Sequence, residues 1–232
     1  MPQILYCGDS VAAGGYPDGT SNKQPGKTVT VDPPPSVAIA IAAAKKFTTV
    51  DKSEGGTSYA GSLAGTNPGN SNIAFRGEPA GTTFAQVLQA DTVSTHVIMR
   101  WGGNDCNLAS PPAILIPSTT FATNVVTAIG LVRARGKIPI IVGQPQLALG
   151  PMSFWNTAPV SAFYDVWGRS LAYEEVMRTL ARLLNVLFID IRNNVSFSFD
   201  TTDTPDGIHS KSAYSARCSV YIGQQIQLAY FP

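Results

Sequence analysis

Short apolar segments alternate along the chain with longer segments in which apolar residues recur at helical spacing. Four short runs predict strands, at residues 3–8, 96–101, 138–142 and 186–191. A further strand is expected at 47–51 or at 72–76. Helical spacing predicts helices over 37–47, from 82 onward, and over 119–135, 160–184 and 211–229. This alternation predicts an α/β fold, with five parallel strands and right-handed crossovers in a three-layer α/β/α sandwich.

Local signals mark the ends of two of these helices. Ser36 is a suitable N-cap for the segment 37–47, which is apolar almost all round and therefore predicts a well-buried helix. Gly136 follows the segment 119–135 in the C′ position, where a glycine with a left-handed backbone ends many helices.

The length of 232 residues fits one domain with a sizeable core. We see no internal repeat and no boundary to a second domain, so we expect a single domain over residues 1–232. Its long loops are expected at 12–35, 50–71 and 144–158. Charged residues make up 13% of the chain, against a usual ~25%, and the formal net charge is +1. Such a neutral, polar surface gives no reason to expect nucleic acid or an anionic membrane as a partner.

Apolar segments, the start of the chain and the cysteines indicate the cellular location to expect. No stretch is long and apolar enough to span a bilayer, and no secretory signal precedes the first strand. We therefore expect a cytoplasmic protein, one that is exported or carried on a virion without a visible signal, or one that has lost a leader. Cys7, Cys106 and Cys218 are odd in number and lie in or beside apolar elements, which favours free thiols over disulfides.

Three polar blocks carry the candidate chemistry. Gly8-Asp9-Ser10-Val11 ends the first strand, Gly102-Gly103-Asn104-Asp105 ends the strand at 96–101, and Asp206-Gly207-Ile208-His209 precedes the last helix. Because the carboxyl ends of parallel strands meet at one edge of a sheet, we expect these blocks to converge. A serine hydroxyl becomes a useful nucleophile only with a base in hydrogen-bond reach and donors for the developing oxyanion.

The base is expected from one of two histidines. His209 lies in a polar loop three residues after Asp206, a spacing that lets the carboxylate accept from Nδ1 and leaves Nε2 to take the proton of Ser10. His96 opens a buried strand, and we interpret it as a hydrogen-bonded structural residue. Neither histidines nor cysteines are clustered as a zinc site requires, so no metal or other cofactor is expected.

Asn104 is the candidate oxyanion donor. Gly102 and Gly103 allow the backbone to turn tightly at the strand end and let a substrate approach, after which the Asn104 amide can donate to a tetrahedral oxyanion. The alternative is an Asx-turn in which Asn104 or Asp105 only closes the strand. The position of Asn104 opposite Ser10 and His209 favours the catalytic interpretation.

In this order the blocks resemble the SGNH hydrolases, the GDSL-type esterases and lipases, over residues 4 to about 228. The resemblance implies a flavodoxin-like sheet, with Ser10 as nucleophile, His209 as general base and then acid, and Asp206 as its orienting partner. It also implies an oxyanion hole made by the Ser10 backbone N–H, a glycine N–H and the Asn104 side chain.

Three glycines are candidates for the glycine donor of that oxyanion hole. Members of the family place it after the second strand, at the start of a helix. Gly81, directly before Thr82 and Thr83, fits that place best, followed by Gly77 and then Gly55. With Gly81, residues 50–71 are an insertion.

The loops suggest the substrate. They hold Tyr16, Phe154 and Trp155 among small polar residues, which suits a sugar face or a half-apolar acyl chain, and no long apolar lid is visible. We expect a serine esterase that removes a small acyl group, preferably acetyl, from a carbohydrate or polysaccharide through an acyl-enzyme on Ser10. Polysaccharide deacetylases and phage tail-associated esterases of the superfamily share these traits. Arg76 is a candidate contact for an acidic sugar, whereas the strand position of Arg100 favours an internal pair.

Three alternatives remain open on the sequence. The same machinery would serve a generalist arylesterase, thioesterase or lysophospholipase. The scaffold could instead be a non-catalytic carbohydrate-binding module, against which the intact Ser10, Asn104, Asp206 and His209 argue. Cys106 could be the nucleophile, but no histidine neighbours it in the sequence. The sequence does not indicate the oligomeric state.

Overall fold

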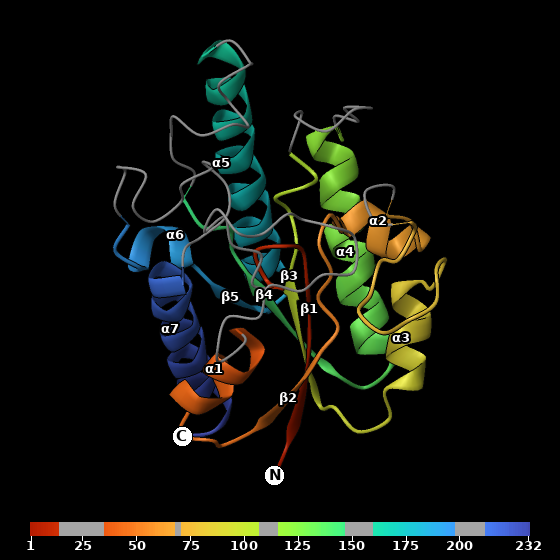
Figure 1. Cartoon of the computed structure of the whole chain (residues 1–232), viewed down its shortest axis with the longest axis vertical. Coiled ribbons are helices and arrows are strands. Elements are labelled where there is room, and N and C mark those ends of the chain that lie inside the picture. Colours follow the sequence, from red (N-terminus) through yellow and green to blue (C-terminus); the bar gives the residue numbers. More distant parts are fainter. Residues whose placement is uncertain (14–34, 68–70, 107–115, 147–159, 198–211) are drawn as a thin grey trace.

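The computed structural model contains one five-stranded, all-parallel sheet and describes residues 1–13, 35–67, 71–106, 116–146, 160–197 and 212–232. The strands lie in the order β2-β1-β3-β4-β5 (Figure 1). They are β1 Gln3–Gly8, β2 Thr48–Asp51, β3 His96–Arg100, β4 Ile138–Val142 and β5 Leu187–Ile189. The α/β fold expected from the sequence is therefore confirmed, and the second strand occupies the first of its two candidate segments.

Helices cover both faces of this sheet (Figure 1). They are α1 Pro35–Ala42, α2 Tyr59–Ala64, α3 Phe84–Ala90, α4 Ser118–Ala134, α5 Val160–Leu183, α6 Ile191–Asn194 and α7 Ser212–Tyr230. One core lies between the sheet and α2 to α5, and the other between the sheet and α1, α6 and α7. None of the helices in the described ranges is both long and apolar enough to cross a membrane.

The three inner strands, β1, β3 and β4, are buried on both faces, so successive side chains enter different cores. Leu5 and Cys7 of β1 pack in the core under α2 to α5, whereas Ile4 and Tyr6 pack in the core under α1 and α7. β3 alternates in the same way. Burial on both faces explains why these strands appear in the sequence as nearly continuous apolar runs.

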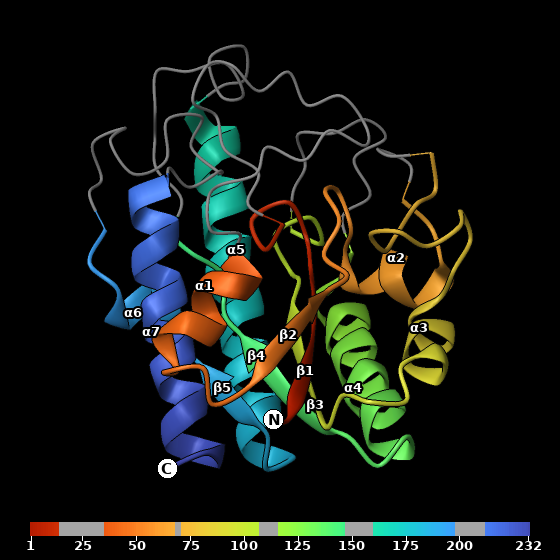
Figure 2. The same ribbon diagram turned by 60° about the horizontal axis from the view of Figure 1, so that its bottom comes forward.

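The two ends of the molecule lie together at the amino edge of the sheet (Figures 1 and 2). Aromatic packing holds the C-terminal end there, with the ring centroid of Tyr230 4.7 Å from that of His96 and the Phe231 centroid 5.4 Å from that of Phe47. Thr95 Oγ1 also lies 2.8 Å from His96 Nδ1. Burial lowers the pKa of His96, and these contacts agree with the structural role expected for it.

Some helix boundaries differ from the sequence expectation. The helix expected over 37–47 ends at Ala42, because Ala44 and Lys45 take left-handed conformations with φ of 50° and 55° and turn the chain into β2. Ser36 lies inside α1 rather than before it, and its hydroxyl donates to Asp51 Oδ2 over 3.3 Å.

Other boundaries follow the local signals. Gly136 has φ +68°, and its N–H donates to the Arg133 carbonyl over 2.9 Å, as expected of a C′ glycine. The strand expected over 186–191 is shorter, because the Asp190 carboxylate accepts from Asn193 N–H over 3.0 Å and starts α6.

Candidate active site

The first two polar blocks begin side by side at the carboxyl edge of the sheet. In the β1–β3 register Gly8 pairs with Arg100, so Ser10 and Asn104 both follow within four residues of this pair. A methyl group added at Gly8 would lie 2.3 Å from the Ala12 Cβ and 2.7 Å from the Arg100 carbonyl oxygen. Only glycine therefore lets the chain fold back immediately after β1.

Asp9 shapes the turn that carries Ser10. Its carboxylate is buried and accepts from Val11 N–H over 3.0 Å, while Ala13 N–H donates to the Asp9 carbonyl over 2.8 Å. These bonds close one helical turn directly after the strand. Ser10 lies in this turn and is partly exposed, so its hydroxyl is held on a rigid element at the surface of the edge.

The loop after β2 lies against this turn. Glu54 N–H donates to the Gly8 carbonyl over 3.0 Å, and a methyl group added at Gly55 would lie 3.7 Å from the Ser10 Cβ. The Gly55 N–H donates over 3.1 Å to the carboxylate of Glu54. This amide next to Ser10 is therefore already bonded to a negatively charged oxygen.

Gly81, the glycine that the sequence favours for the oxyanion hole, has a different place. Its N–H donates to the Asn72 carbonyl over 3.1 Å, and its own carbonyl lies against Gly65 at the end of α2. Gly77 is exposed, with Lys52 as its neighbour. The structure thus brings Gly55 rather than Gly81 to Ser10, because the second strand ends at Asp51 and leads directly into residues 53–57.

Asn104 reaches across to the same loop. Gly102 has φ +126°, a conformation that only glycine adopts readily, and Cys106 N–H donates to its carbonyl over 3.3 Å. The Asn104 Nδ2 donates to the Thr57 carbonyl over 2.9 Å. A side-chain amide carries two N–H groups, so one remains to be directed at a ligand.

Asp105 joins the block after β3 to helix α2. It is fully buried and accepts from Tyr59 N–H over 3.0 Å and from Ala60 N–H over 3.4 Å, in the first turn of that helix. Burial raises the pKa of Asp105 to about 7, although these two N–H groups act in the opposite direction. Asp105 therefore fixes the relative position of Asn104 and the loop that contains Gly55.

Gln144 is a buried residue of the edge that the sequence did not single out. Its Nε2 donates to the Trp101 carbonyl over 2.7 Å. A methyl group added at Gly103 would lie 3.2 Å from both Gln144 Oε1 and Asp9 Oδ2, so the chain passes between these two side chains. The available signal was a polar residue two positions after β4, at the edge where ligands bind in such sheets.

The second half of the expected triad, Asp206 and His209, lies outside the described residues, as do Tyr16, Phe154 and Trp155. α7 begins at Ser212, three residues after position 209, and its first turn lies on the carboxyl side of the sheet (Figure 2).

The arginines and cysteines considered in the sequence analysis make internal contacts or are buried. Arg76 lies 3.4 Å from the carboxylate of Asp51, and the buried Arg100 donates to the Tyr6 hydroxyl over 3.1 Å. All three cysteines are buried and unbridged. No three His, Cys, Asp or Glu side chains come together as a metal site within the described ranges.

Comparisons with known proteins bear on the fold. No family model matches the chain, and no curated protein matches its sequence. Among solved structures, Est24, a carbohydrate acetylesterase from Sinorhizobium meliloti, superposes with a TM-score of 0.74 at 19% identity, covering 99% of this chain and 100% of its own. The chain has the SGNH hydrolase fold.

Two further structures support this assignment. The inhibitor-bound aryl esterase of M. smegmatis has a TM-score of 0.72 at 18% identity, covering 98% of this chain and 99% of its own. A GDSL-like lipase from Bacteroides thetaiotaomicron has a TM-score of 0.60 at 13% identity, covering 98% and 88%. At such identities the likeness concerns the SGNH hydrolase fold, and function has to be argued from the site itself.

Proposed function

We propose that the protein is a serine esterase in which Ser10 is the nucleophile. The observation that carries the proposal is the meeting of three segments from distant parts of the chain. Ser10 follows β1, Gly55 follows β2 with its Cα next to the Ser10 side chain, and Asn104 follows β3 and bonds to Thr57 of the second segment. Acyl transfer requires a nucleophile with N–H donors within reach, and the meeting of these segments supports such an arrangement.

The proposed reaction proceeds through an acyl-enzyme. Ser10 Oγ attacks the ester carbonyl carbon while its proton passes to His209 Nε2, and Asp206 accepts from Nδ1 of the same ring. The tetrahedral intermediate collapses, the bond to the alcohol breaks, and His209 returns the proton to the leaving oxygen. Water then attacks the acyl-enzyme with His209 as base, which releases the carboxylic acid and restores the Ser10 hydroxyl.

In this proposal one N–H donor of the oxyanion hole differs from the donor expected from the sequence. Gly55 replaces Gly81 as the glycine donor, beside the Ser10 N–H and the second N–H of the Asn104 amide. The Gly55 N–H has to exchange the Glu54 carboxylate for the substrate oxygen as charge develops. The exchange of Gly81 for Gly55 is supported by position: a methyl group added at Gly55 would lie 3.7 Å from the Ser10 Cβ, whereas one added at Gly81 would have no atom within 4 Å.

The test is hydrolysis of nitrophenyl acetate by the full chain and by Ser10→Ala. We expect the rate to fall by about 10³ or more, because the nucleophile is lost while the oxyanion donors remain. Ser118→Ala, an exposed serine at the start of α4, is the matched control and should retain the wild-type rate. Undiminished turnover in Ser10→Ala would overturn the proposal.

For the substrate we propose an acetyl group on a carbohydrate. Support comes from the low charge of the chain and from the fold shared with a carbohydrate acetylesterase. The fold shared with an aryl esterase favours a generalist arylesterase as the second candidate. Acetyl, butyryl and octanoyl nitrophenyl esters, assayed beside acetylated xylan, separate the two: a preference for octanoyl esters would favour the generalist.

A further inference from the structure

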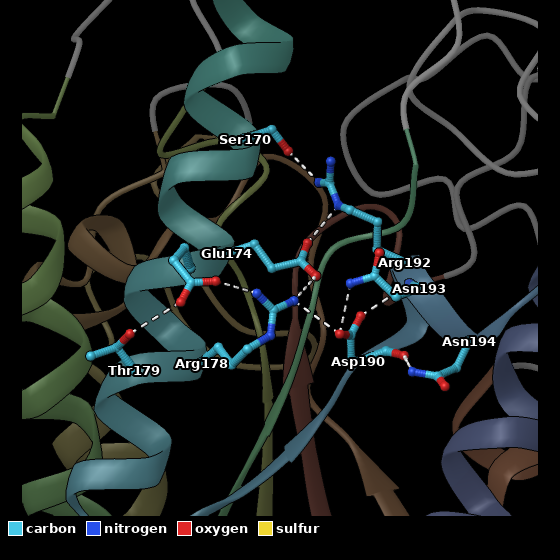
Figure 3. A network of polar contacts seen from close by, with 9 residues as sticks. Ser170, Glu174, Arg178, Thr179, Asp190, Arg192, Asn193 and Asn194 are labelled. Carbon is cyan, nitrogen blue, oxygen red and sulfur yellow. Dashed lines mark hydrogen bonds and ion pairs between the residues drawn. The ribbon is translucent and has the colours of Figure 1, made fainter.

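A second polar cluster lies at the same edge of the sheet, between α5 and the start of α6 (Figure 3). At its centre is Arg192, whose side chain is only 2% exposed. Its Nε donates to Glu174 Oε2 over 2.6 Å, and its Nη2 donates to the Ser170 hydroxyl. The third nitrogen, Nη1, points away from both partners (Figure 3). It is buried and has no hydrogen-bond partner among the residues that the structure describes.

Arg169 presents a second nitrogen of the same kind. It precedes Ser170 on α5, and its Nε donates to the Cys106 carbonyl over 3.3 Å. Its Nη2 is buried and, within the described part of the chain, equally without a partner. Since Cys106 comes two residues after Asn104, Arg169 connects this cluster to the proposed oxyanion hole.

Both guanidinium groups act on one neighbour, Cys106. Ser170, which binds Arg192, is the sequence neighbour of Arg169. Burial and the Asp105 carboxylate raise the pKa of the Cys106 thiol to about 12, while the charges of Arg192 and Arg169 act on the same thiol in the opposite direction. Both cations therefore lie close to Cys106.

The carboxylates of this cluster, Glu175 included, pair with Arg178 and Arg192 rather than with Arg169. Glu174 is shared by Arg192 at 2.6 Å and Arg178 at 3.3 Å, and Arg178 also pairs with Asp190 at 2.9 Å. No carboxylate among the described residues forms an ion pair with Arg169. A buried N–H without a partner is rare in proteins and calls for a ligand or an ordered water. Two such N–H groups on neighbouring guanidinium cations, one of which has no ion pair within the described ranges, are the complement of a carboxylate.

We propose that Arg169 and Arg192 bind a carboxylate group of the substrate, which makes the preferred substrate the ester of an acidic sugar such as a uronic acid. The carboxylate site stands on the two unpaired nitrogens, and its assignment to the substrate rests on the proposed esterase function. Arg169 is only partly buried, so the cluster lies closest to the surface on its side. In this proposal the acyl group of the same ligand lies at Ser10, since Arg169 bonds to Cys106, two residues after Asn104.

Binding is tested without hydrolysis, by calorimetric titration of the full chain with sodium glucuronate. Two control ligands are titrated in the same way. Glucose is the neutral counterpart of glucuronate, and sodium phosphate is an inorganic anion. We expect glucuronate to bind, glucose not to bind, and Arg169→Gln to weaken glucuronate about tenfold or more. Arg182→Gln, which removes one exposed charge from the same helix, is the control variant and should bind glucuronate as tightly as the wild type does. Equal binding by Arg169→Gln, or binding of phosphate in preference to glucuronate, would overturn the proposal.

Rates of ester hydrolysis then test whether the carboxylate that binds Arg169 and Arg192 belongs to the substrate. The acetyl esters of methyl glucuronoside and methyl glucoside differ in the carboxylate, and we expect the ratio of their kcat/KM values to favour the acidic ester. In Arg169→Gln this ratio should fall about tenfold, and in Arg182→Gln it should not change. A wild-type ratio near one would overturn the substrate assignment. Binding of glucuronate by a chain that hydrolyses no ester would instead overturn the esterase proposal and leave the carboxylate site standing.

Discussion

At the scale of single residues, the site depends on how a few N–H groups are shared. The Asn104 amide uses one N–H to hold the Thr57 carbonyl and has a second one for a ligand. The Asp105 carboxylate accepts the first two N–H groups of α2. The sequence predicts the candidate nucleophile and Asn104, because both follow apolar strands within a recognisable block. It does not predict these bonds, which join residues 45 to 47 positions apart.

Replacing Asn104 tests the second donor. Asn104→Ala should lower kcat by about 10²–10³ and leave KM nearly unchanged, since the lost N–H acts on charge that develops only in the transition state. Steady-state kinetics with nitrophenyl acetate measure the effect, and Asn194→Ala, an exposed amide on α6, serves as control. A change confined to KM would contradict the assigned role.

At the scale of elements, the strands were predictable and the segment between β2 and α3 was not. β1, β3 and β4 are apolar on both faces and stand out from their polar flanks. Residues 52–83 are rich in Gly, Ser, Asn and Thr and carry little periodic signal. Asn67 holds this segment together by donating to the Gly55 carbonyl over 2.9 Å and to the Ile73 carbonyl over 2.7 Å. Such contacts across the loop leave no trace in local pattern.

Alanine substitutions at Gly55 and at Gly81 test which of the two glycines belongs to the active site. Gly55→Ala should lower kcat/KM about tenfold or more with little loss of stability, because the methyl group lies 3.7 Å from the Ser10 Cβ in ordinary contact and narrows the site. Gly81→Ala should keep kcat/KM and lose about 1 kcal/mol of stability, because its φ of +84° strains any other residue. Kinetics and urea unfolding of both variants check this, and the reverse result would restore Gly81 as the donor.

At the scale of the whole molecule, two apolar cores carry a sheet whose carboxyl edge is crowded with buried polar groups. Asp9, Asp105 and Gln144 lie there among the turns that carry the candidate site. The alternation of strands and helices predicted this architecture and the edge at which the blocks meet. The charge on the edge could not be predicted, because burial of a carboxylate depends on which helix covers it.

Burial of Asp105 gives stability a dependence on pH. Its pKa is raised to about 7 in the folded protein from 3.8, so the folded state binds this proton more tightly than the unfolded chain does. The contribution to stability is complete below about pH 4 and is lost as pH rises through 7. We expect it to fall by about 2 kcal/mol between pH 5 and pH 7.

Urea unfolding at several pH values measures this contribution as the difference between the wild type and Asp105→Asn. The asparagine keeps the shape of the side chain and removes its titration, so its stability should depend less on pH over the same interval. Parallel curves for the two proteins would show that Asp105 does not titrate there.

The position of the two chain ends has a practical consequence. Both lie at the amino edge of the sheet, and Tyr230 and Phe231 anchor the last turn of the chain there. A linker, a fused protein or a solid support attached at either end would thus sit on the far side of the molecule from Ser10. Tethering through either terminus should therefore leave the edge that carries Ser10 facing the medium and open to large polymers.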